Sequence, residues 1–170
     1  MKWIAVLALG LSFNALAAAE GSGGGNGGGI HKCGPKIEVY DLYEGRTRYG
    51  YEFPAKIPSV EKYLARALAK IGNSSPRLKY KIQQQLEYLN DGHFLPRDGL
   101  RMEVINDANI LVVGMGCSYV QLANWDDLSG NVLVKNEYYS QLTNLDKAAL
   151  KLHEATYKVY RDDTHAHDSS

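Results

Sequence analysis

AALKLHEATYKVYR, residues 148–161, is the longest helical pattern in this 170-residue chain. At about 100° per residue, its apolar side chains return to one face of an α-helix. Thr143 or Asn144 supplies the N-cap, and the helix is expected to run to about Arg161. The stripe expected to be buried consists of Leu145, Ala149, Leu152, Thr156 and Val159.

Three polar side chains of this helix lie outside the apolar stripe. His153 and Tyr157 fall on its edge, and Glu154 falls on the side expected to face solvent. There Glu154 is placed to pair with Lys158 one turn later, an exposed helix pair worth a few tenths of a kcal/mol. His153 is expected to hydrogen-bond Tyr157 or a loop carbonyl, which gives the helix a structural role.

The segment before this helix has a strand-like composition. Short runs rich in β-branched residues cover 102–105, 110–113, 118–122 and 132–135, separated by Asn, Asp and Gly. They predict a mostly antiparallel sheet. Gly114-Met115-Gly116-Cys117 predicts a sharp bend between two of its strands.

The first half of the domain predicts a hairpin followed by two helices. Residues 37–43 and 49–53 alternate as strands around a turn at 44–47. One helix follows the N-cap signal Pro58-Ser59 and ends at Gly72; the next starts at Ser75-Pro76 and stops at Gly92. The chain is therefore expected to be a single α+β domain: a mostly antiparallel sheet, two helices in the N-terminal half and a long C-terminal helix.

The N-terminus has the pattern of a cleavable signal peptide. Lys2 precedes an apolar run, and Ala-x-Ala sites stand at 15–17 and 17–19. Residues 20–30 are glycine-rich and are expected to form a flexible linker. The expected organisation is a signal peptide at 1–19, a linker at 20–30, the domain at 31–162 and a flexible tail at 163–170, in a protein that is secreted or periplasmic.

Charge and hydropathy exclude several classes of function. Lys plus Arg and Asp plus Glu number 19 each, so nothing steers the chain to nucleic acid or to an anionic membrane. No run approaches the roughly 20 apolar residues that a membrane-spanning helix needs. A hydrophobic fraction of 45% is typical of a folded globular domain.

Two cysteines, Cys33 and Cys117, remain in a chain expected to reach an oxidising compartment. A lone pair there favours a disulfide over free thiols. The bridge would close a loop of more than 80 residues and would stabilise the domain by about 4.5 kcal/mol at most.

The His153-Glu154 pair also permits an enzymatic hypothesis. The helix resembles that of zinc-dependent peptidases, in which a histidine followed by glutamate places a metal ligand and a general base on one helix. The resemblance implies His153 as ligand and Glu154 as the catalytic base that takes a proton from zinc-bound water. Tyr157 stands where those enzymes have a second histidine. The remaining candidate metal ligands are Asp163, His165 and His167.

A second resemblance covers most of the mature chain. Asp41-Leu42-Tyr43-Glu44, the Gly116-Cys117 turn and the helix from Ala148 to Tyr157 together resemble a group of uncharacterised exported bacterial proteins with a C-terminal Leu-His-Glu-x-x-Tyr helix. The resemblance implies a shared fold and carries no assigned activity.

Two hypotheses of different class follow from the sequence. The first is an exported binding or structural module with no cofactor, whose partner would be a protein or a peptide. The second is a divergent zinc hydrolase that uses His153 and Glu154. They differ in geometry, because the hydrolase requires His153, Tyr157 and one tail residue to converge on a single open point.

Overall fold

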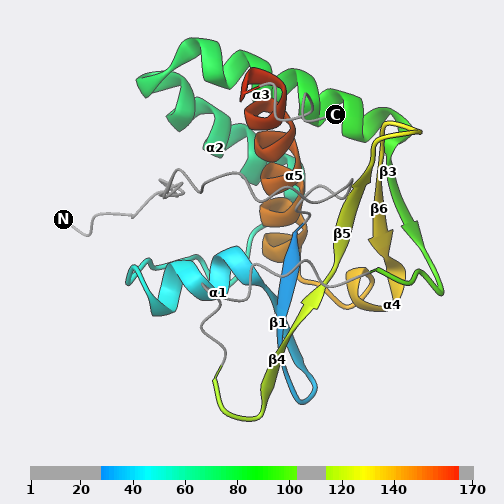
Figure 1. The fold of residues 1–170 in the computed structure, drawn as a ribbon. Helices are drawn as coiled ribbons and strands as arrows, with labels where there is room; N and C mark the ends of the chain where they lie inside the picture. Colours follow the sequence, from blue (N-terminus) through cyan, green and yellow to red (C-terminus); the bar gives the residue numbers. More distant parts are fainter. Residues whose placement is uncertain (1–27, 103–113, 165–170) are drawn as a thin grey trace.

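The computed structural model describes residues 28–102 and 114–164 and has the predicted α+β fold. Helix α5 runs through the middle of the molecule, and the other elements surround it (Figure 1). In chain order the elements are β1 (Gly29–Cys33), β2 (Lys36–Val39), α1 (Tyr40–Thr47), α2 (Val60–Ser74), α3 (Pro76–Tyr88), η1 (Leu89–His93), β3 (Phe94–Arg97), β4 (Cys117–Gln121), β5 (Ala123–Asp126), β6 (Asn131–Lys135), α4 (Asn136–Tyr139) and α5 (Asn144–Thr164).

The strands form two small sheets with one parallel pairing. Strand order is β2-β1-β4 in the first sheet and β3-β6-β5 in the second. Every neighbouring pair is antiparallel except β3 and β6. The chain passes from the first sheet to the second at Leu122, between β4 and β5. The predicted strands at 118–122 and 132–135 correspond to β4 and β6, whereas those at 102–105 and 110–113 fall almost wholly outside the described residues.

The predicted hairpin of residues 37–43 and 49–53 is wrong. Lys36–Val39 does form a strand, but it pairs with the preceding β1 across a turn in which Gly34 has φ 56°. The chain then enters helix α1, which buries Leu42. Inside that helix, a Cβ at Gly45 would come 2.9 Å from Phe53 Cζ, so the missing side chain lets the segment after the helix pack closely. The apparent turn at 44–47 is therefore helical, and its glycine serves close packing.

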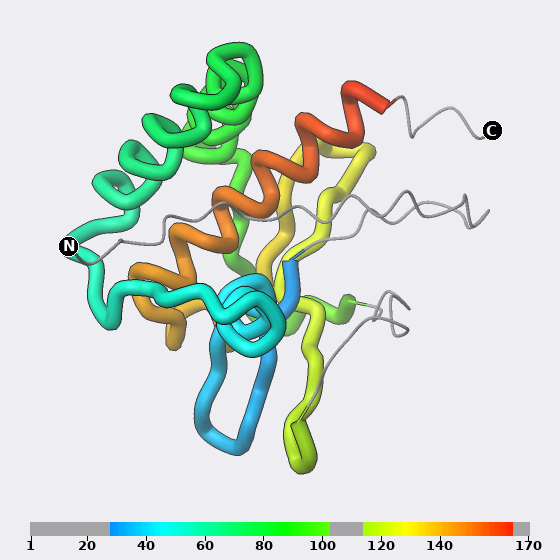
Figure 2. Tube along the Cα trace, turned by 90° about the vertical axis from the view of Figure 1, so that its left-hand side faces the viewer, coloured from blue at the N-terminus to red at the C-terminus, as the bar shows by residue number. Residues whose placement is uncertain are grey.

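Helices α2 and α3 begin where their capping residues predicted. The Ser59 hydroxyl accepts a hydrogen bond from Lys62 N, and the Ser75 hydroxyl accepts one from Leu78 N. Pro76 occupies the first turn of α3, where its missing N–H has no partner to lose. Helix α3 is followed by the π-type turn η1. Gly92, where the second helix was predicted to stop, has φ 93° in this turn. The two helices pack against α5 on the side away from the second sheet (Figure 2).

Helix α5 is buried on more than one face. The five residues of the predicted stripe are all buried, which confirms that part of the pattern. The helix contacts α1, α2, α3 and β2, so a second row of side chains is also enclosed. This second row includes Leu150, Glu154 and Arg161. A surface helix has one apolar stripe, but α5 is a central helix.

Both ends of the domain differ from the expected boundaries. Strand β1 begins at Gly29, inside the segment expected to be linker. Helix α5 continues to Thr164, so Asp163 belongs to its last turn and not to a tail. Residues 1–27 and 165–170, which contain the expected signal peptide and most of the tail, lie outside the described residues. Within the described part, no helix is long and apolar enough to span a membrane.

Candidate functional site

Glu154 lies in the interior of the protein, and its predicted solvent exposure is wrong. Its relative exposure is 0%, and Gly28 N–H donates a hydrogen bond of 2.6 Å to Oε1. The predicted pair with Lys158 is also wrong, because Lys158 reaches Asp162 instead. The prediction from the sequence pattern failed here because it assumed that one face of the helix is exposed to solvent. Glu154, in the middle of α5, instead forms a contact between the helix and Gly28, at the start of the described residues.

Gly28 joins three parts of the fold. Its N–H binds Glu154, and its carbonyl oxygen accepts from Leu122 N at 3.0 Å and from Ala123 N at 2.9 Å. Those two residues mark the passage from one sheet to the other. A Cβ at Gly28 would collide with Leu150 Cδ1 and lie 3.0 Å from Glu154 Oε1. Glycine is therefore required here because the backbone itself approaches the helix.

His153 forms an ion pair with helix α1, and its Cδ2 would lie 3.6 Å from a Cβ placed at Gly28. Its Nδ1 lies 2.7 Å from Asp41 Oδ2, and both side chains are about one quarter exposed, at 28% and 25%. The two residues are 112 positions apart. They belong to the two motifs that the sequence analysis singled out, Asp41-Leu42-Tyr43-Glu44 and the His-Glu helix. The fold brings these motifs into direct contact.

The protonation of this group follows from its charges. Burial by itself would lower the pKa of His153, but the Asp41 carboxylate outweighs it, with a smaller contribution from Glu154, and raises that pKa to about 9. His153 holds the pKa of Asp41 below its usual value despite the opposing effect of burial. Burial raises the pKa of Glu154, against the influence of His153 and the Gly28 N–H. His153 is therefore a cation at neutral pH.

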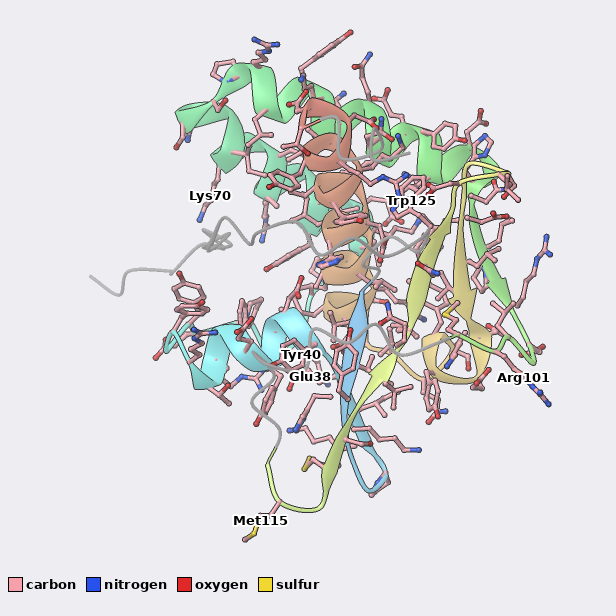
Figure 3. All side chains as sticks on the ribbon, viewed as in Figure 1. Glu38, Tyr40, Lys70, Arg101, Met115 and Trp125 are labelled. Atoms are coloured by element: carbon pink, nitrogen blue, oxygen red, sulfur yellow. A yellow bond between two sulfur atoms is a disulfide. The ribbon has the colours of Figure 1, made fainter. Side chains whose placement is uncertain are left out.

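One oxygen of the Glu154 carboxyl group can accept a hydrogen bond that the described residues do not supply. Oε2 is buried and has no hydrogen-bond partner among the described residues, and the same holds for the indole N–H of Trp125. The two side chains are close enough for Trp125 to lower the pKa of Glu154, although they fall short of hydrogen-bond geometry. Trp125 is on β5 beside α5 (Figure 3).

The candidate metal ligands of the sequence analysis are spread along α5. His153 and Tyr157 are one turn apart. Asp163 lies ten residues beyond His153, about 15 Å along the helix axis, and it forms an ion pair with Lys81 on α3. His165 and His167 lie outside the described residues. Within the described part, the structure brings His153 to Asp41 and places Asp163 at the far end of the helix.

The predicted disulfide is present and joins strands β1 and β4. Cys33 on β1 and Cys117 on β4 are direct partners in the antiparallel register, with Cα atoms 4.4 Å apart. The predicted bend at 114–117 is present directly before β4. Its Cys117 N–H donates a hydrogen bond to Gly114 O at 3.1 Å, and Gly116 has φ 75°. The bridge connects the first strand of the domain to a strand 84 residues later.

A third ionisable side chain, His31, stands beside this bridge. It precedes Cys33 by two residues on β1, so both point to the same face of the sheet. Its imidazole nitrogens lie 3.5 and 3.7 Å from Cys33 Sγ. The ring stacks on Tyr43 with centroids 3.6 Å apart and an interplanar angle of 10°. Among the described residues, His31, Cys33 and Cys117 form the group of His, Cys, Asp or Glu side chains that is compact enough to hold a metal ion.

Sequence reasoning missed Asp41, Gly28 and His31. No local pattern indicates which acidic residue reaches His153, because Asp41 is distant in the chain. Gly28 is hidden at the end of a glycine-rich run whose other members give the same signal. His31 was detectable, because a histidine two residues before a cysteine in a strand shares its face, but the first predicted strand began at residue 37 and β1 was missed.

Comparison of the sequence with protein-family models and with curated proteins, and of the structure with solved structures, found no match.

Proposed function

We propose that this chain is an exported, disulfide-bonded binding or structural module, in which the His-Glu helix holds the fold together and performs no hydrolysis. The expected signal peptide and the bridge between Cys33 and Cys117 support export. The partner would be a protein or a peptide, because the balanced charge favours neither nucleic acid nor an anionic membrane.

The observation that carries this proposal is the burial of Glu154. A zinc hydrolase needs this carboxylate at an open site, where it takes a proton from metal-bound water. Here Oε1 accepts the Gly28 N–H and the side chain has no exposed surface. The neighbouring His153 binds Asp41 through Nδ1 and so links α5 to α1. Glu154 therefore has a structural partner in the position where the enzymatic role would require a metal-bound water.

The test is elemental analysis of the oxidised mature protein, combined with two variants. We expect no stoichiometric zinc bound through His153, and the same metal content in wild type and His153→Ala. His93→Ala is a matched control, because His93 is another partly buried histidine, but it lies on η1 and pairs with Asn131. Stoichiometric zinc that disappears in His153→Ala, with a hydrolytic activity abolished in Glu154→Gln, would overturn the proposal and establish the hydrolase.

A further inference from the structure

The sheet geometry places three metal-binding side chains on one face of β1 and β4. His31 and Cys33 alternate on β1, and Cys117 is the register partner of Cys33. The ligand atoms of the three residues all lie within 4.8 Å of one another. Two cysteines and one histidine are a known zinc ligand set with a fourth position left for water. In the disulfide form, however, each sulfur is bonded to the other and cannot act as a thiolate ligand.

The distances in this group suit zinc once the sulfurs are free. Zinc–sulfur bonds of about 2.3 Å and zinc–nitrogen bonds of about 2.0 Å at tetrahedral angles place N and S about 3.5 Å apart. The observed separation of His31 Nε2 and Cys33 Sγ is 3.5 Å. Two thiolates on one zinc are about 3.8 Å apart. Rotation of the cysteine side chains supplies that separation while the paired strands stay in register, and the imidazole must turn to aim one nitrogen at the ion.

The surroundings of His31 keep its ring available as a ligand. The ring nitrogens of His31 face the Cys33 sulfur, at 3.5 and 3.7 Å. The Glu38 carboxylate is held by Arg46, to which it is bound through both oxygens. The stack on Tyr43 fixes one face of the imidazole without occupying a ring nitrogen.

The bridge is also accessible to a reductant. Cys33 and Cys117 are both partly exposed. Cys117 follows the Gly114–Gly116 turn, where Met115 is fully exposed at the tip of the loop (Figure 3). A thiolate from another molecule can therefore approach the disulfide, which is the condition for exchange.

We propose that His31, Cys33 and Cys117 form a zinc site that exists only when the disulfide is reduced. A dithiol reductant supplies two electrons and two protons: the Cys33–Cys117 bond breaks, two thiols form, and the reductant becomes a disulfide. Zinc then replaces the two thiol protons, which are released, and binds two thiolates and the His31 imidazole. The fourth position is taken by water or by a ligand atom of a partner. The same corner is thus a covalent link in an oxidising compartment and a metal site in a reducing one.

The test uses Zn²⁺ alone with the full mature chain. The protein is reduced with a dithiol, freed of reductant without air, and analysed for bound zinc after gel filtration. We expect one zinc per reduced chain, no zinc at this corner in the oxidised chain, and at least a tenfold weaker affinity in reduced His31→Ala. Reduced His93→Ala, which removes the other stacked histidine, should bind as wild type does. Co²⁺ in place of Zn²⁺ should give a thiolate charge-transfer absorption that Cys117→Ser abolishes.

Circular dichroism of the same samples keeps the result interpretable if reduction loosens the fold. A reduced chain that loses helical signal and regains it on addition of zinc supports the site, because metal binding then drives folding. A reduced chain that binds no zinc, folded or unfolded, overturns the proposal. So does zinc that is bound equally by His31→Ala. Zinc that persists in His31→Ala and disappears in His153→Ala would overturn it as well and would favour the hydrolase hypothesis instead.

Discussion

His153 and His31 occupy opposite electrostatic environments at two corners of the domain. His153 faces Asp41 and has Glu154 beside it, and its pKa rises to about 9. His31 is enclosed by the Tyr43 ring and a disulfide sulfur, and burial lowers its pKa. The first is a cation that holds two helices together, and the second is a neutral ring beside two sulfurs. The residue that the sequence motif highlights is thus the one held by an ion pair between two helices.

The two corners also differ in how they join distant segments. The Cys33–Cys117 corner uses a covalent bond, and the Glu154 corner uses a hydrogen bond to Gly28 and an ion pair to Asp41. Both connect the first strand region to later parts of the chain. Mutations can remove the disulfide, the Gly28–Glu154 hydrogen bond or the His153–Asp41 ion pair one at a time, so their contributions to the free energy of unfolding can be compared.

Loss of the disulfide should have the largest effect. The double variant Cys33→Ala/Cys117→Ala opens a loop of 84 residues, and the chain-entropy estimate is a loss of up to about 4.5 kcal/mol in the free energy of unfolding. Urea denaturation of the oxidised wild type and the variant measures it. If the two corners are independent, the variant keeps the His153–Asp41 pair. Equal stability with and without the bridge would contradict this account.

Gly28→Ala should be the next most harmful change. Its Cβ has no room between Leu150 and Glu154, so the helix or the strand must shift, at a cost of about 1–3 kcal/mol. Gly72→Ala is the matched control, since the new Cβ there meets the flexible end of Lys79 and alanine favours a helix interior. Thermal denaturation should show a lower Tm for Gly28→Ala than for wild type, and an unchanged or higher Tm for Gly72→Ala. The reverse order would show that Gly28 is not packed against α5.

The His153–Asp41 pair should contribute a coupling of about 1–2 kcal/mol, measured by a double-mutant cycle of His153→Ala and Asp41→Ala. The pKa of His153 is raised above its unfolded value of about 6.5 to about 9 in the folded state. The contribution is therefore fully present below about pH 6.5 and is lost as the pH rises through about 9. Wild-type stability should fall across that range, and Asp41→Asn should remove most of this dependence. A cycle with no coupling at pH 6 would contradict the ion pair.

Glu154→Gln should have the smallest effect of the four, a loss of about 1 kcal/mol. Glutamine keeps an oxygen that can accept the Gly28 N–H and keeps the volume of the side chain. The exposed Glu52→Gln is the control and should change stability by less than about 0.5 kcal/mol. Denaturant midpoints of the two variants, measured at pH 7, separate a buried from an exposed glutamate. Identical midpoints would favour the solvent-exposed position that the helix pattern alone predicts.

Helices α2, α3 and α5 were predictable from the sequence because their signals are local. Ser59, Ser75 and Pro76 cap α2 and α3 where they were expected to. The predicted stripe of α5 is buried, and the disulfide was predicted from the cysteine count and the expected oxidising compartment. Each of these inferences depends only on residues close together in the sequence or on the single pair of cysteines.

Two of the failures involve contacts between distant segments, and one is local. Glu154 was assigned to solvent because its enclosure depends on Gly28, 126 residues away. The hairpin is the local failure, because β2 pairs with β1 across the Gly34 turn and the residues that follow form helix α1. Asp41 could not be assigned to His153, since the pairing depends on how α1 packs against α5. Local patterns located α2, α3 and α5 but missed α1, and the long-range contacts depend on tertiary packing.

The most direct test of the structural role of the His-Glu helix is an NMR titration of the histidine side chains in the oxidised mature protein, with His153→Ala and His31→Ala used for assignment. We expect His153 to titrate with a pKa of about 9 and to lose that elevation in Asp41→Asn. His31 should titrate below the usual value near 6.5. A His153 that titrates at or below about 6.5 would be a neutral ring at pH 7, free to bind a metal, and would contradict the structural role assigned to this helix.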